Sequence, residues 1–103
     1  MQLLTINYVP GHDIEALCMV KGSVVPTKHF GKDFMAGMKT LVGGEISSYT
    51  EMLTEARQIA TKRMVDEANA MGAAAVINIR FGSSSVMQSA AEVIAYGTAV
   101  KFK

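Results

Sequence analysis

Cys18, His12 and His29, together with eight methionines, are the side chains in this sequence that could bind a soft metal ion. Thiolate and thioether sulfur suit Cu(I), and imidazole binds several transition metals. A structural metal site usually has four ligands, more than these residues offer within one subunit. A histidine from each subunit of a ring could converge on its axis, so a soft metal bound by the assembly stays an open alternative.

The same residues also have an ordinary structural interpretation. Cys18 falls in a period-two pattern with Ile14, Ala16 and Val20, which predicts a strand and a cysteine packed in the core. His12 follows a Pro-Gly turn and His29 follows Pro26, so both are expected in solvated loops. A Cys18–His29 catalytic dyad is disfavoured because activated thiolates need electropositive, partly exposed surroundings.

The double glycine Gly43-Gly44, followed by Ser47-Ser48, is the second candidate site. Backbone amides at a helix start could bind phosphate or carboxylate without any cofactor. However, no lysine follows at the spacing of a phosphate-binding loop. Ser48 and Glu51 also fit a capping box, which uses two of those amides. The stretch is therefore interpreted mainly as a corner between two helices, with an anion site as the alternative.

Acid–base chemistry finds little support in the sequence. Glu92 and Arg80 could form a half-exposed ion pair across a hairpin, and Asp33 is expected at a helix start. No second carboxylate or base can be placed beside either acid, so no catalytic residue is predicted and an enzyme is disfavoured.

The hydrophobic periodicity predicts strands at both ends of the chain and helices between them. The expected elements are strands at 3–9 and 14–25, a short helix at 30–41, a long helix at 49–71, and strands at 73–81 and 87–102, with a hairpin loop at 82–85. Gly72 is expected to end the long helix, and Gly22 to mark a bulge or a close backbone approach. This order predicts one α+β domain over residues 1–103, a two-layer sandwich with both helices on one face of a mostly antiparallel sheet.

Composition narrows the class of protein. Hydrophobic residues make up 50% of the 103 residues and charged residues 18%, so we expect other subunits to cover part of the apolar surface. A net charge of +1 argues against a nucleic-acid partner. No apolar run approaches the ~20 residues of a spanning helix, which argues against a membrane partner. One cysteine and no secretory signal favour the cytoplasm.

Several short motifs, in order along nearly the whole chain, resemble a known family. They are Val20-Lys21-Gly22, 33–37, Val42-Gly43-Gly44, Tyr49, Ala56-Arg57, 68–73 and 92–100. With these residues the chain resembles the YbjQ-like family of small bacterial and archaeal proteins, sometimes described as heavy-metal-binding domains.

The resemblance implies a dodecin-like α+β subunit and a closed homopentamer whose sheets surround a barrel-like centre. It implies no established reaction and no required cofactor. Heavy-metal-associated domains carry a Cys-x-x-Cys loop, and this sequence has none. The expected function is therefore a ring-forming binding or scaffold protein for a small ligand or ion, with soft-metal handling as the alternative.

Overall fold

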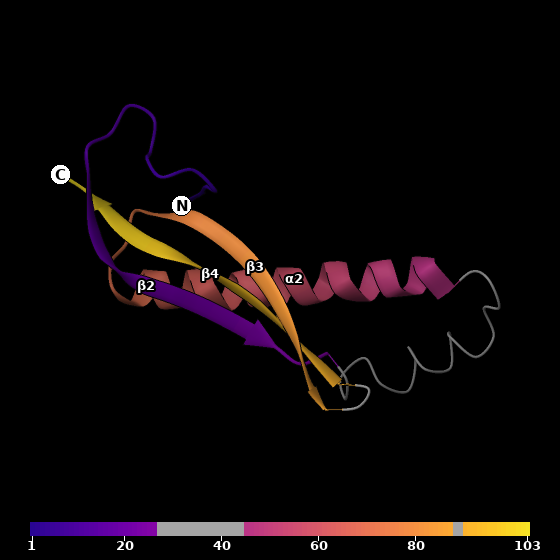
Figure 1. Cartoon of the computed structure of the whole chain (residues 1–103). Helices are drawn as coiled ribbons and strands as arrows, with labels where there is room; N and C mark the ends of the chain where they lie inside the picture. Colours follow the sequence, from indigo (N-terminus) through magenta and orange to yellow (C-terminus); the bar gives the residue numbers. More distant parts are fainter. Residues whose placement is uncertain (27–44, 88–89) are drawn as a thin grey trace.

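The computed structural model describes residues 1–26, 45–87 and 90–103 (Figure 1). Its elements are β1 (Gln2–Leu3), β2 (Ile14–Val24), α2 (Glu45–Ala70), β3 (Ala75–Met87) and β4 (Ala90–Phe102). The short helix predicted at 30–41, with Asp33 at its start, lies outside the described residues. Within the described part of the chain, no helix is both long and apolar enough to cross a membrane.

The four strands form one mixed sheet in the order β1-β3-β4-β2. β4 is antiparallel to both of its neighbours, whereas β1 runs parallel to β3 over two residue pairs. α2 lies across one face of this sheet, mainly over β2 and β4 (Figure 1). The predicted α+β class is confirmed, with one helix on a mixed sheet.

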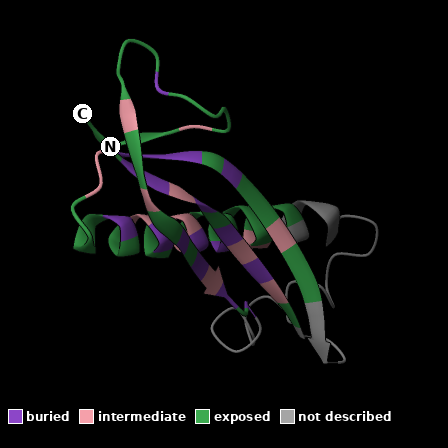
Figure 2. Cartoon of the chain, turned by 60° about the vertical axis from the view of Figure 1, so that its left-hand side comes forward, coloured by how far each residue is buried: buried purple, intermediate pink, exposed green. Residues whose placement is uncertain are grey.

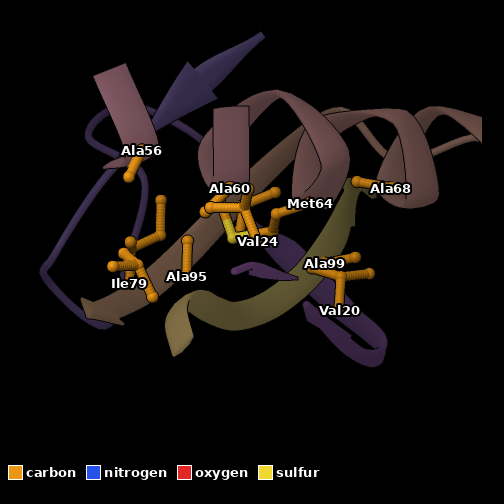
Figure 3. Packing of buried hydrophobic residues seen from close by; sticks show 11 residues of the cluster. Val20, Val24, Ala56, Ala60, Met64, Ala68, Ile79, Ala95 and Ala99 are labelled. Atoms are coloured by element: carbon orange, nitrogen blue, oxygen red, sulfur yellow. The ribbon is translucent and has the colours of Figure 1, made fainter. Parts of the chain in front are cut away.

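The main core lies between α2 and the sheet, where small side chains dominate (Figure 3). Its buried members are Val20, Val24, Ala56, Ala60, Met64, Ala68, Val76, Ile79, Val93, Ala95 and Ala99. The helical members recur every four residues and those of β4 every two, which are the periods of one buried face in each element. Figure 2 shows buried positions along the inner side of α2 and exposed ones along its outer side.

Gly22 lets α2 come unusually close to β2. A Cβ atom at this position would lie 2.7 Å from the Cβ of Arg63, and closer still to the carbonyl oxygen of Ala60 and the amide nitrogen of Met64. The expected close approach of another backbone is therefore confirmed, and that backbone belongs to the long helix. A helix packed this tightly on a strand requires glycine at the point of contact.

A second, smaller core lies on the opposite face of the sheet. Its buried residues are Val9, Ala75, Ile77 and Val100, with Leu4 and Ile14 packed against them. The predicted strand at 3–9 is wrong beyond Leu3, but the segment after it stays hydrogen bonded to β3. The Leu4 amide donates to the Val76 carbonyl, and the Leu4 carbonyl accepts from the Ile79 amide. The Ile6 carbonyl accepts from the Asn78 amide. The N-terminal segment thus covers one end of this face.

The two ends of α2 differ in how well the sequence predicts them. The helix already includes Ser48, so a capping box starting at that residue is wrong. At the other end Gly72 has a φ of +76°, and its amide donates to the Asn69 carbonyl while the Ala73 amide donates to Ala68. These two bonds are a Schellman motif, so the predicted glycine stop is confirmed.

β3 is longer and less regular than its sequence pattern indicates. The serine stretch at 82–85, predicted as a hairpin loop, continues the strand to Met87. Asn78 has a φ of +53° at a register shift between Ile77 and Arg80, which moves Ile79 to the helix side of the sheet. The resulting register places Arg80 opposite Tyr96 and Glu92 opposite Ser84, so the predicted Arg80–Glu92 ion pair is wrong.

The contact at Gly22 predicts a large cost for a single methyl group. Gly22→Ala is expected to lower the free energy of unfolding by about 2 kcal/mol or more, because rigid backbone atoms cannot move away from the new Cβ. Urea unfolding followed by circular dichroism, at one fixed protein concentration, measures this. The control is Gly82→Ala, whose Cβ would meet Ile94 at an ordinary 3.4 Å. Equal effects for the two variants would contradict the assigned contact.

The helix stop at Gly72 predicts a smaller, conformational effect. A Cβ here meets nothing within 4 Å, so the cost of Gly72→Ala arises from the positive φ alone. We expect a loss of about 1 kcal/mol, and a smaller loss for Gly72→Asn because asparagine tolerates this conformation better. Thermal unfolding of both variants provides the comparison. An alanine variant as stable as the wild type would show that the chain ends the helix differently.

Candidate functional site

Cys18 is exposed, which corrects the expectation that it packs in the core. A register shift in β2 lies directly before this residue: Ala16 lies opposite Val100 and Cys18 opposite Ala99, so Leu17 is an extra residue. Leu17 packs against the main core from this position. The period-two pattern of the sequence therefore breaks between Ala16 and Cys18, and the thiol is accessible to a ligand or an oxidant.

His12 is held at one end of the sheet. Its ring stacks on the ring of Phe102, with 4.0 Å between centroids and an interplanar angle of 8°. The turn before it contains Gly11 with a φ of +80°, and the His12 amide donates to the Val9 carbonyl, so the predicted turn is confirmed. His12 is exposed as expected for a loop residue, but its ring is oriented by an aromatic partner.

Three of the predicted site residues, His29, Gly43 and Gly44, lie outside the described residues. Ser47 and Ser48 belong to the first turn of α2 that the structure describes. Their backbone is helical, and the anion site proposed for this corner stays a prediction.

The described residues do not gather into a metal centre. Among residues 1–26, 45–87 and 90–103, no three His, Cys, Asp or Glu side chains lie close enough together to hold an ion. His12 stacks on Phe102, whereas Cys18 lies opposite Ala99, three residues away along β4. At ~3.3 Å per residue the two donors are separated by roughly 10 Å along the sheet. They do not form one site within a subunit.

An open groove of about 450 Å³ runs between α2 and β3. It is lined by Thr54, Arg57, Gln58, Thr61, Lys62 and Phe81. Phe81 provides the aromatic surface and is 50% exposed. The two cations are already engaged on the helix: Arg57 Nη2 donates to Thr54 Oγ1 at 3.3 Å, and Lys62 Nζ pairs with Asp66 Oδ2 at 3.0 Å. The groove therefore offers mainly apolar surface.

The two edges of the sheet are protected differently. At β2, side chains of α2 reach the outward-facing backbone groups: Glu67 Oε1 accepts from the Lys21 amide at 3.3 Å, and Arg63 Nη1 donates to the Ser23 carbonyl at 2.6 Å. At β3, the N-terminal segment bonds the strand only as far as Ile79.

In an antiparallel sheet the backbone amides and carbonyls of successive residues point alternately to one side of the strand and to the other. This alternation shows which backbone groups of β3 face outward. Lys21 and Ser23 bond to α2, so their partners Tyr96 and Ile94 turn their backbone groups toward β3 instead. Their neighbours there are Arg80 and Gly82. The residues between and beyond these, Phe81 and Ser83, therefore direct their amides and carbonyls away from the sheet. Within the described residues, no strand pairs with this part of β3.

The exposed edge and the groove beside it were not predicted from the sequence. The only signal was the serine run, whose small polar residues favour a loop as much as a strand. Phe81 and Val86 flank that run, but they are five residues apart and so do not continue a period-two alternation through it.

Comparison with known proteins identifies relatives along the full chain. The YbjQ family model, described as "Putative heavy-metal-binding", matches residues 1–103. A UPF0145 protein of Fervidobacterium nodosum is 62% identical, covering 100% of this chain and 96% of the relative. A UPF0145 protein of Clostridium novyi is 57% identical over 98% of both chains.

A solved structure shares the fold at much lower sequence identity. A Pediococcus pentosaceus protein of unknown function from the DUF74 family aligns with a TM-score of 0.58 and 15% identity. The alignment covers 100% of this chain and 98% of that one. This likeness concerns the fold alone. The full-length family match and the high identity to its relatives establish that this chain belongs to the YbjQ family.

Proposed function

We propose that the chain assembles into a closed homopentameric ring and serves as a binding or scaffold protein rather than as an enzyme. The observation that carries this proposal is the exposed edge of β3 at Phe81 and Ser83. Such an edge presents unsatisfied amides and carbonyls that pair readily with a strand of another chain. Phe81 and the groove beside it add apolar surface to the same side of the subunit.

The uneven protection of the two edges supports a specific contact rather than general association. Glu67 and Arg63 occupy the outward-facing groups of β2 at Lys21 and Ser23, so this part of β2 is closed to a further strand. Between Phe81 and Ser84 the sequence of β3 contains neither lysine nor proline, the residues that often protect such an edge. A neighbouring subunit at β3 would therefore meet one defined surface. The dodecin-like ring expected from the family resemblance is compatible with that contact.

The subunit count and the role of β3 can be tested together by native mass spectrometry. We expect a species of about 55 kDa, five copies of the 11.0 kDa chain. Ser83→Pro removes an outward-facing amide and is expected to shift the protein to smaller species without loss of its circular dichroism spectrum. Ser83→Thr keeps that amide and should leave the assembly intact.

Two results would contradict the proposal in different ways. A wild-type monomer at micromolar concentration would remove the ring altogether. A pentamer that survives Ser83→Pro would keep the ring but exclude the edge of β3 as its contact. Extra mass retained by the assembly without added metal would indicate the class of the bound ligand.

Soft-metal binding is a second candidate function, favoured by the exposure of the Cys18 thiol. A thiolate that solvent reaches can donate to Cu(I), and symmetry-related copies could supply the ligands that one subunit lacks. His12 and His29 are the imidazoles that would complete such a shared site. No cofactor is required for the ring itself.

The metal hypothesis predicts a clear dependence on sulfur. If Cys18 is a ligand, Cys18→Ser should weaken binding of Cu(I) at least 100-fold in an anaerobic isothermal titration, because an alcohol is a poor ligand for this ion. His12→Ala and His29→Ala should each have a measurable but smaller effect. Identical titration curves for wild type and all three variants would exclude these residues as ligands. Mass spectrometry of the same variants shows whether the ring is unaffected.

A further inference from the structure

Three side chains line up across the sheet on the face that α2 does not cover. Tyr96 in β4 lies directly opposite Lys21 in β2 and opposite Arg80 in β3. Directly opposed residues have Cβ atoms about 5 Å apart, and the two outer strands are roughly 10 Å apart. The Cβ atom of Tyr96 therefore lies between those of the two basic residues, in one row across three strands.

This row is open to solvent. Tyr96 is 39% exposed, and both Lys21 and Arg80 are exposed. The N-terminal segment packs on the same face around Ala75, Ile77 and Val100, and it reaches Arg80 through the Thr5 carbonyl. In the adjacent row Met19, opposite Thr98, is 62% exposed, so the uncovered surface extends beyond Tyr96.

Two of the three side chains have defined settings. Arg80 Nη1 donates to the Thr5 carbonyl at 3.0 Å and to the Ile79 carbonyl at 2.9 Å, which anchors the guanidinium group. Arginine has five N–H donors, so three remain for a ligand. A Cβ at Gly82 would lie 4.0 Å from Cε1 of Tyr96, which shows that the ring extends over a position with no side chain.

The charges around the row favour an anion. Glu67 approaches Lys21 at the outer edge of β2 and accepts the backbone amide there. Glu92 lies four residues from Tyr96 along β4, about 13 Å at ~3.3 Å per residue. Glu15 is already paired with Lys101 at 3.5 Å. The row itself carries two positive charges and no negative one.

A single aromatic ring flanked by cations suits a ligand with one planar ring and one anionic group. Bases stack on exposed aromatic side chains, and phosphate is attracted by lysine and arginine. Nucleic-acid platforms stack successive bases on several aromatic residues, whereas the described part of this face presents only Tyr96 in the row. A mononucleotide matches the size of the row better than a strand does.

We propose that Lys21, Tyr96 and Arg80 form a binding site for a nucleoside monophosphate. The base stacks on Tyr96, and the phosphate binds Lys21 or Arg80 according to the orientation of the ligand. The site goes beyond the ring proposal, because all three of its residues belong to one chain. Mass spectrometry tests the ring, whereas ligand titration tests this site.

Methionine methyl resonances provide a reporter for this site. In protein labelled with ¹³C at the methionine methyl groups, AMP at 50 mM NaCl is expected to shift the Met19 resonance with a sub-millimolar Kd. The Met71 resonance, at the C-terminal end of α2, should not move. Met19→Leu assigns the signal. Adenosine and inorganic phosphate, which each supply half of the ligand, should bind at least tenfold more weakly than AMP.

Matched variants separate the site from general electrostatics. Tyr96→Leu and Lys21→Gln should each weaken AMP binding at least fivefold, while Lys101→Gln, outside the row, should leave it unchanged. An unshifted resonance of the buried Met64 shows that a variant is folded. No Met19 shift with AMP, GMP, CMP or UMP at 5 mM would overturn the proposal. So would unaltered binding by Tyr96→Leu, or tighter binding of a single-stranded oligonucleotide than of any mononucleotide.

Discussion

The contact between Gly22 and the backbone of α2 is the constraint on which the rest of the structure depends. It sets the distance between helix and sheet, because Ala60, Arg63 and Met64 all approach a position that holds no side chain. The facing residues of the helix and of β4 are correspondingly small, with alanine at five buried helix or strand positions around Met64. A larger residue at any of these points would lift the helix and expose the layer beneath it.

The same closeness brings charged side chains to the strand edge. Arg63 and Glu67 are one helical turn apart. Because α2 lies so close to β2, their side chains reach the Ser23 carbonyl and the Lys21 amide on either side of Gly22. The glycine and the two hydrogen bonds thus belong to one arrangement. The close packing of α2 on β2 and the hydrogen bonds at the edge of β2 both depend on the absence of a side chain at Gly22.

The parts of the fold that the sequence predicts are those governed by local pattern. The glycine stop of α2, the Pro-Gly turn and the two alternating faces of β4 follow from residue type and spacing, and the structure confirms them. The errors come from register. One extra residue at Leu17 moves Ile14 to the face of the smaller core, and a positive φ at Asn78 redirects Ile79 and Arg80. Neither bulge changes the composition of its strand, so each becomes visible only through the partner strand.

For the candidate sites, too, the sequence shows the local chemistry but not the strand register. The chemical character of Cys18 and His12 can be read from the sequence, but their separation along the sheet cannot. The row of Lys21, Tyr96 and Arg80 joins residues that are up to 75 positions apart, and a shift of one residue in either strand pairing would dissolve it. Long-range register, rather than residue type, therefore decides which functional groups meet in this protein.

The covered edge at Lys21 and Ser23 also limits how copies of the chain can add to one another. A sheet with two open edges can grow without end, since each added subunit presents a fresh edge to the next. Here the helix blocks one of the two directions at those residues. If strands can be added only at β3, two subunits that pair through their β3 edges leave no open edge for a third. A larger assembly then requires a second contact surface on each subunit. If copies of the chain meet at β3 as proposed, the covered edge of β2 would prevent continuous growth of the sheet by strand addition at both edges.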